Sequence, residues 1–345
     1  GLAVARRREL QGRRGGRCLL ALAAVLVAGC SDTGTGPEQG TDPQPTPDYP
    51  LAGFVTVAPG VSLHYLDFGG EGDPVLLLAG LGNTANVFRE FAPLLTDHYR
   101  VLALTRRGFG RSSQPSSGYD PATLARDIAA VLDSLGIQKI DLIGHSIAGE
   151  EMSRFAVDHP QRLGRLVYLD AAYDRTLPSE SPTPVWAVPP GPTVADVASR
   201  TAFQTFLSGV LGVRFPLEEV AATTVVANDG TVAGYVTPSS INQAILTTVE
   251  KPDYATIEAP ALAIYAIPDT PDDVAPWLSP GSAAWDSAQA WIDSETVPAR
   301  REQIALFESS VPNGVAVVLE GVNHYLFIEK QTEVLAAVLS FLGGG

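Results

Sequence analysis

The sequence has little cysteine and few basic residues. Only two of its 345 residues are cysteine, and both, Cys18 and Cys30, precede residue 31. The rest of the chain therefore cannot form an internal disulfide, and its stability must come from packing. Lysine and arginine number 23 against 38 aspartate and glutamate residues. A chain with this acidic balance is not expected to bind nucleic acid.

The first 29 residues differ from the rest. Arginines are followed by the apolar run from Cys18 to Ala28, which is too short to span a membrane stably, so residues 1–29 are predicted to be a secretion signal. The ending Val27-Ala28-Gly29-Cys30 resembles a bacterial lipoprotein signal, in which the cysteine is lipidated. We therefore expect an exported protein of the bacterial cell envelope, periplasmic or on the outer surface. Its only membrane contact would be a lipid on Cys30.

The remaining chain divides by composition. Residues 30–50 are rich in proline, glycine, threonine and aspartate, cannot bury enough apolar surface to fold, and are predicted to be a disordered tether. Residues 51–172 and 259–345 form the predicted core, and the proline-rich interval 173–258 a cap inserted between strands. Without residues 1–29 the chain has 17 basic and 37 acidic residues, a formal net charge of −20, which we read as a solubility feature.

Short apolar runs alternate with helical patterns along the core. The first two strands, 54–57 and 61–68, are separated by Ala58-Pro59-Gly60 and predict an antiparallel hairpin. The later runs suit a parallel sheet covered on both faces, so the alternation predicts a doubly wound α/β sheet. The predicted strands are 75–79, 101–104, 140–143, 166–169, 261–266 and 315–319, and the predicted helices 85–95, 121–135, 149–157, 194–211, 239–249, 299–309 and 332–342.

One segment joins a strand to a helix through a serine. Residues 140–150 pass from an apolar strand through a turn of small residues, with Ser146 at its apex. Such a turn holds a serine Oγ exposed at the carboxyl edge of a sheet, where it can act as a nucleophile. The usual pattern Gly-x-Ser-x-Gly is met imperfectly, because Ala148 stands at the last position and Gly149 follows it.

A general base should follow the serine in the chain, on a loop after a later strand. There are five histidines: His64 lies in the predicted hairpin, His98 and His159 precede strands at the opposite edge, and His145 adjoins the serine. His324, in the loop after the last predicted strand, is the remaining candidate for the base. Because the histidines are scattered and the body lacks cysteine, no metal and no redox cofactor is predicted.

The order of strand, serine turn, cap, acid and histidine resembles the α/β-hydrolase family over residues 52–342. Two further segments match that family: 78–82, Leu-Ala-Gly-Leu-Gly, and 106–113, Arg-Arg-Gly-Phe-Gly-Arg-Ser-Ser. The resemblance implies an eight-stranded sheet with a cap after the sixth strand, and an oxyanion hole formed by the backbone N–H groups of Leu81 and Ile147. The chain departs from the family at Ala79, often His, and at Thr105, often Asp.

Two aspartates compete for the role of the triad acid. Asp269 follows a predicted strand that resembles the family's seventh, and it is the preferred candidate. Asp170 ends the sixth strand, at a site that some members use instead, and is the alternative. Asp170 could also simply cap the backbone that enters the insertion. Asp272 and Asp273 are more remote options.

A serine in this turn indicates acyl transfer, whereas an aspartate would indicate epoxide or haloalkane hydrolysis. The preferred function is hydrolysis of a carboxylic ester with a small or medium apolar acyl group, through an acyl-enzyme. A perhydrolase or acyltransferase would use the same triad, and the loop at 106–113 is similar to that of cofactor-free haloperoxidases. A tethered, non-catalytic binding protein on a hydrolase scaffold is the alternative from another class.

Overall fold

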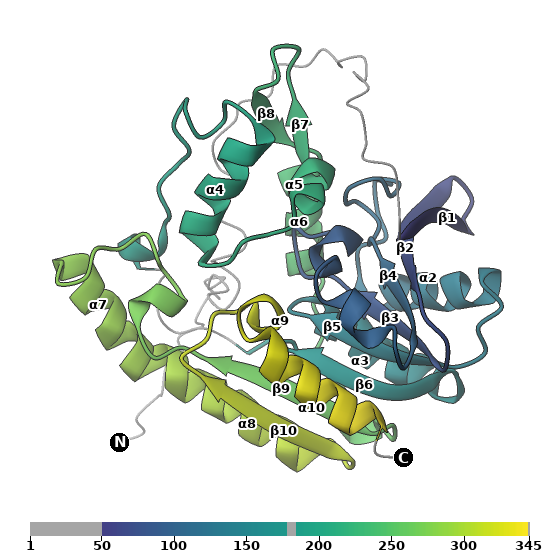
Figure 1. Ribbon diagram of the computed structural model, residues 1–345. Helices are drawn as coiled ribbons and strands as arrows, with labels where there is room; N and C mark the ends of the chain where they lie inside the picture. The colour runs from purple at the N-terminus through teal and green to yellow at the C-terminus, as the bar shows by residue number, and fades with distance from the viewer. Residues whose placement is uncertain (1–49, 178–183, 344–345) are drawn as a thin grey trace, which may run out of the picture.

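The centre of the computed structural model, which describes residues 50–177 and 184–343, is an eight-stranded sheet (Figure 1). The strand order is β1-β2-β4-β3-β5-β6-β9-β10. Strand β2 is antiparallel to both of its neighbours and every other pair is parallel. The predicted sheet is thus confirmed. The strands are Leu51–Ala58 (β1), Val61–Gly69 (β2), Pro74–Leu78 (β3), Arg100–Leu104 (β4), Ile140–His145 (β5), Leu163–Leu169 (β6), Ala261–Ile267 (β9) and Gly314–Glu320 (β10).

Helices cover both faces of this sheet. Each face of the sheet has its own buried apolar cluster, and successive side chains of β3 enter them alternately. Val75 and Leu77 belong to the first cluster, and Leu76 and Leu78 belong to the second. Helices α2, α3 and α8 pack on the second cluster, and α9 and α10 on the first. Burial on both faces explains why the parallel strands are apolar throughout. These helices are Pro121–Ser134 (α2), Ala148–Asp158 (α3), Val297–Ser310 (α8), Leu326–Glu329 (α9) and Gln331–Gly343 (α10).

Two helix predictions had different outcomes. The predicted start at Pro121 is confirmed, since the Asp120 side chain accepts a hydrogen bond from the Thr123 N–H and caps α2. The single helix predicted over 85–95 is wrong: two 3₁₀ segments, Ala85–Phe88 (η2) and Ala92–Leu95 (η3), occupy this stretch. Proline at position 93 has no N–H to donate to the preceding turn, which accounts for the break.

The insertion between β6 and β9 has its own small elements. In Figure 1, α4, α5 and the two-stranded β7–β8 sheet stand to one side of the main sheet, away from the helices on its faces. We use the word cap for this segment. It contains Arg200–Leu211 (α4), Leu217–Thr223 (α5), Thr224–Val226 (β7), Val232–Tyr235 (β8) and Ser239–Thr247 (α6), and Ala283–Trp291 (α7) follows β9.

The predicted signal over residues 1–29, Cys30 and the tether up to residue 49 lie outside the described residues, so the lipid anchor stays a prediction of the sequence. Over residues 50–177 and 184–343, no helix has the length and apolar character needed to cross a bilayer.

Candidate active site

Ser146 lies at a sharp bend between β5 and α3. Its φ of 56° is a left-handed backbone conformation that is uncommon for a residue with a side chain. Two glycines make the bend possible. A Cβ at Gly144 would lie 2.1 Å from the Met152 sulfur, and a Cβ at Gly149 would lie 2.0 Å from the Ala171 carbonyl oxygen. The close approach at Gly149 lets the start of α3 pack against the chain that follows β6, and glycine at 144 leaves room for the Ala148 side chain.

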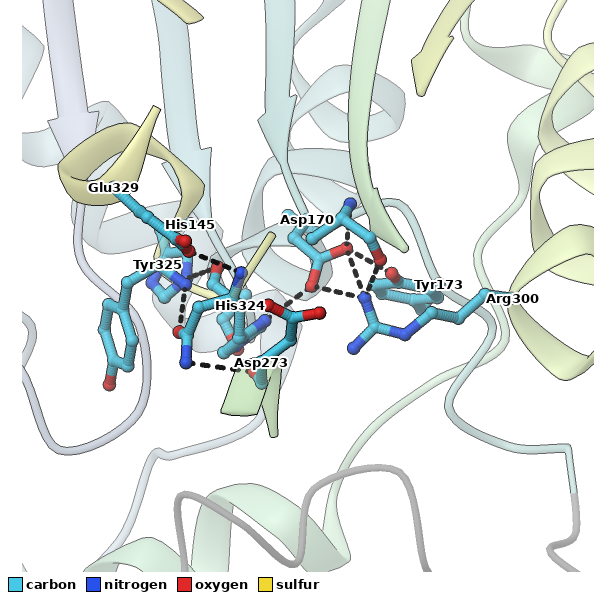
Figure 2. Close-up of polar contacts among 12 residues, drawn as sticks. His145, Asp170, Tyr173, Asp273, Arg300, His324, Tyr325 and Glu329 are labelled. Carbon is cyan, nitrogen blue, oxygen red and sulfur yellow. Dashed lines mark hydrogen bonds and ion pairs between the residues drawn. The ribbon is translucent and has the colours of Figure 1, made fainter. Parts of the chain in front are cut away.

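His324 lies in the loop after β10, beside this bend. Its ring centroid is 4.5 Å from the ring of His145, the residue before Ser146. His324 Nδ1 forms a 2.6 Å hydrogen bond with Asp170 Oδ2 (Figure 2). A histidine that donates from Nδ1 to a carboxylate keeps Nε2 unprotonated and able to accept a proton.

Asp170 directly follows β6 and is fully buried. Its backbone, like that of Ser146, is left-handed, with φ 47°. Besides the His324 contact, its carboxylate accepts hydrogen bonds from the Tyr173 hydroxyl, the Ala266 N–H at 3.0 Å and Arg300 Nη1 at 3.2 and 3.3 Å. Burial alone would raise the pKa of Asp170, but Arg300 and the other partners hold it well below its usual range.

The preference for Asp269 as the partner of His324 has to be corrected, because the histidine pairs with the alternative, Asp170. Asp269 is exposed, and no hydrogen bond joins it to His324 within the described part of the chain. Its carboxylate lies near Gly321, and its N–H donates to Asp273 Oδ2 at 2.8 Å. The physical reason is that the chain after β9 forms a capped turn at this point, whereas the chain leaving β6 buries its aspartate.

Asn323 fixes the loop that carries His324. Its N–H donates to Glu329 Oε2 at 2.6 Å, and its Nδ2 donates to the Leu211 carbonyl of the cap at 2.8 Å. Its Oδ1 accepts from the Tyr325 N–H at 2.9 Å. In Figure 2, Tyr325 and Glu329 both lie on the side of His324 away from Asp170. The cap therefore helps to hold the candidate base in place.

His145, beside the nucleophile, has a supporting position. Its Nε2 lies 3.0 Å from the His324 carbonyl oxygen, to which it donates, and its Nδ1 is buried without a partner in the described structure. Burial lowers the pKa of His145 well below its usual value, and the ring is neutral near pH 7. A neutral donor in this place fixes the backbone of the histidine loop without adding charge.

A tight turn after β3 lies against the serine. The Asn83 N–H donates to the Gly80 carbonyl at 3.3 Å, and Gly82 takes a φ of 82°, so residues 80–83 form one turn. We refer to residues 80–83 as the oxyanion turn. A Cβ at Gly80 would lie 3.3 Å from Ser146 Cβ, so glycine is what allows this approach.

Two backbone N–H groups are available next to Ser146. Leu81 lies within the oxyanion turn and Ile147 caps the start of α3. Neither N–H has a hydrogen-bond acceptor among residues 50–177 and 184–343. The first turn of a helix leaves such groups free, and donors of this kind can stabilise an oxyanion.

Arg106 holds the beginning of the oxyanion turn. Its Nη2 donates to the Ala79 carbonyl at 2.8 Å, and its Nε and Nη2 bind the two carboxylate oxygens of Glu151 at 2.8 Å each. Both side chains are buried. This contact gives a structural role to the first arginine of the 106–113 segment.

The sequence did not identify Arg175 and Glu150 as residues that support the serine turn. Arg175 Nη2 donates to the Ser146 carbonyl at 2.8 Å, and its Nη1 lies 3.3 Å from Glu150 Oε1. The pair is buried behind the serine turn. A charged residue in a cap or in the first turn of a helix usually faces solvent, so no pattern pointed to this role. No group of three potential metal ligands occurs in the part of the chain that the structure describes.

Comparison with known proteins agrees with this architecture. Residues 73–209 match the family described as alpha/beta hydrolase fold. Over 122 residues the chain is 38% identical to the non-heme chloroperoxidase of Streptomyces lividans, covering 34% of this chain and 44% of that protein. It is 34% identical to the soluble epoxide hydrolase of Corynebacterium sp., covering 32% of this chain and 38% of that protein. The chain thus spans less than half the length of these curated relatives.

Solved structures extend the likeness to most of the chain. E-2-(acetamidomethylene)succinate hydrolase aligns with a TM-score of 0.61 at 18% identity, covering 86% of this chain and all of the other. Carboxylesterase CesB of Bacillus subtilis aligns with a TM-score of 0.59 at 19% identity, covering 87% of this chain and 93% of the other. The chain therefore has the α/β-hydrolase fold, and the sequence relatives are enzymes of this fold with different reactions.

Proposed function

We propose that this protein is a serine hydrolase that cleaves a carboxylic ester with a small or medium apolar acyl group. The observation that carries the proposal is the pairing of His324 with the buried Asp170, next to a serine in a left-handed turn. A hydrogen-bonded acid and histidine beside a strained serine are the parts that nucleophilic acyl transfer requires. In this proposal Asp170, and not Asp269, is the acid of the triad.

The reaction follows from these positions. Ser146 Oγ attacks the ester carbonyl carbon while His324 Nε2 takes its proton. The N–H groups of Leu81 and Ile147 donate to the oxyanion, and the alcohol leaves with the proton from His324. A water molecule then attacks the acyl-enzyme, passing a proton through His324 to Ser146 and releasing the acid. Asp170 keeps the histidine in the required tautomer and stabilises its cationic form.

The preference for an apolar acyl group rests on the side chains around the two N–H donors. Leu81 and Ile147 belong to a buried apolar cluster with Phe109 and with Ile241 and Ile245 of α6. A cap helix of this character places aliphatic groups beside the carbonyl site, where they would exclude water and favour an apolar substrate.

Similarity to a non-heme chloroperoxidase favours one second candidate, perhydrolysis. In that reaction hydrogen peroxide instead of water would attack the same acyl-enzyme and release a peracid. The two activities share Ser146, His324 and Asp170 and differ in the second nucleophile, so they are separated by the product and not by the residues.

The deciding experiment compares the parent protein with Ser146→Ala on chromogenic esters of increasing acyl length, with a peracid assay in parallel. We expect the variant to lose on the order of 10⁴-fold or more in kcat while keeping its circular dichroism spectrum. A serine-reactive phosphonate should label the parent at Ser146 alone. Near-parental activity in Ser146→Ala would reject the proposal, and a parent that neither hydrolyses nor becomes labelled would favour the binding protein.

A further inference from the structure

Glu219, in helix α5 of the cap, is a fully buried carboxylate. No arginine, lysine or histidine of residues 50–177 or 184–343 forms an ion pair with it. Its neighbour Glu218 is partly exposed, and its carboxylate lies 3.7 Å from Arg89 Nη1. A buried carboxylate without a cation is costly, so its hydrogen bonds must offset much of that cost.

The donors include Asn83, the last residue of the oxyanion turn, and Thr84, which directly follows it. Asn83 Nδ2 donates to Glu219 Oε1 at 3.1 Å, and the Thr84 N–H donates to the same oxygen at 2.9 Å. The Thr84 hydroxyl makes a short bond to Oε2. One carboxylate of the cap therefore binds the two residues that follow Leu81 and Gly82.

The same contact reaches the histidine loop. The Tyr325 hydroxyl donates to Asn83 Oδ1 at 3.2 Å, and Tyr325 adjoins His324. The amide of Asn83 is thus oriented from both ends, by the cap at Nδ2 and by the histidine loop at Oδ1. Arg106 holds the other end of the oxyanion turn through Ala79. Leu81 lies between these two attachments.

We propose that Glu219 is a positioning residue that holds the oxyanion turn from the cap and so sets the direction of the Leu81 N–H. The inference rests on the proposed function, because the oxyanion is that of the ester reaction. The cap would then help to position the oxyanion donor Leu81, in addition to contributing apolar side chains beside the site. Small displacements of an oxyanion donor reduce the rate of the chemical step more than they reduce substrate binding.

The test uses Glu219→Ala, Glu219→Gln and the control Glu218→Gln in the whole protein. Glutamine can accept from the Asn83 amide and the Thr84 N–H with Oε1. It has no acceptor for the Thr84 hydroxyl, whose oxygen already accepts two bonds from Asn86, so it keeps only part of the contact. We expect kcat on a chromogenic ester to fall roughly 10- to 100-fold in Glu219→Ala, with KM nearly unchanged. Glu218→Gln should stay within about threefold of the parent, and Glu219→Gln should lie between this control and Glu219→Ala.

Two further measurements separate positioning from loss of folded protein. Phosphonate titration counts competent serines, and kcat is expressed per competent serine. Hydrogen exchange should become faster in residues 79–88 of Glu219→Ala and stay unchanged in α2. If Glu219→Ala does not fold, Asn83→Ala removes one partner while leaving the carboxylate in place, and it should show the same selective loss of kcat.

The proposal is overturned if Glu219→Ala, or Asn83→Ala in its place, keeps parental kcat per competent serine, or if only KM changes. Unchanged exchange in residues 79–88 would also overturn it. Failure of the proposed function looks different, since the parent would then hydrolyse no ester that depends on Ser146. The exchange measurement still tests the structural link in that case.

Discussion

Asp170 and Glu219 are both carboxylates with no exposed surface, yet their environments act in opposite directions. Asp170 lies against Arg300, and its pKa is held well below the usual range although burial opposes this. Glu219 accepts hydrogen bonds but has no cationic partner among residues 50–177 and 184–343, and burial raises its pKa to about 7. Burial is common to both sites, so the nearby cation decides which carboxylate keeps its charge.

The difference suits two different tasks. In the proposed mechanism, Asp170 must stay ionised while His324 gains a proton, and the ion pair with Arg300 favours the ionised form. A carboxyl group that holds a turn can work in either protonation state. The Thr84 N–H donates to Oε1 and the Thr84 hydroxyl donates to Oε2, and a neutral carboxyl group keeps acceptor capacity. The three predictions below test this contrast.

The largest expected effect belongs to Asp170→Asn. Asparagine keeps the shape but removes the charge and favours the wrong tautomer of His324, a change that costs on the order of 10⁴-fold in kcat in a serine protease. We expect a loss approaching that size in ester hydrolysis. Asp269→Asn is the matched control and should stay within a few-fold of the parent. Equal, small effects in both variants would mean that neither aspartate orients the histidine.

The second prediction removes the cation. Arg300→Met leaves the buried Asp170 without its ion-pair partner, and breaking such a pair typically lowers the free energy of unfolding by about 3 to 5 kcal/mol. Urea denaturation at pH 7 measures the change. The neighbouring Arg301 pairs with Glu320 at 3.1 Å on the surface, where both side chains are more than half exposed. Arg301→Met should therefore cost less than about 1 kcal/mol, and similar costs for the two arginines would contradict the contrast.

Local patterns were enough to predict the sheet and to single out Ser146 and His324 as candidates for the site. The apolar runs marked the strands, the small residues around Ser146 marked the bend, and the loop after the last strand marked His324. These signals lie within a few residues of the feature they specify. The structure accordingly brings Ser146 and His324 to the same edge of the sheet.

The partners of the two buried carboxylates could not be predicted in this way. Arg300 lies 130 positions beyond Asp170, and Thr84 lies 135 positions before Glu219. No periodicity connects such distant residues, since only the packing of the folded chain places them together. The choice between Asp170 and Asp269 was difficult for the same reason, because both follow a strand and differ mainly in what surrounds them.

The smallest expected effect concerns the pH dependence of stability at Glu219. Its pKa of about 7 in the folded protein exceeds the ordinary value of 4.5, so between these pH values the folded chain keeps a proton that the unfolded chain has released. The free energy of unfolding due to this group therefore falls as pH rises through that window. Glutamine does not titrate, so Glu219→Gln should gain stability relative to the parent from pH 4.5 to pH 7, by about 2 to 3 kcal/mol.

Denaturation curves of the parent and Glu219→Gln at pH 5, 6, 7 and 8 measure this gain. The titratable side chain linked to this contact is Tyr325, whose pKa is raised by burial and so lies further above this range. Glu218→Gln is the matched control and should run parallel to the parent. A constant difference between Glu219→Gln and the parent across these pH values would show that Glu219 stays ionised. The contrast with Asp170 would then lie in the bonding partners alone and not in the charge.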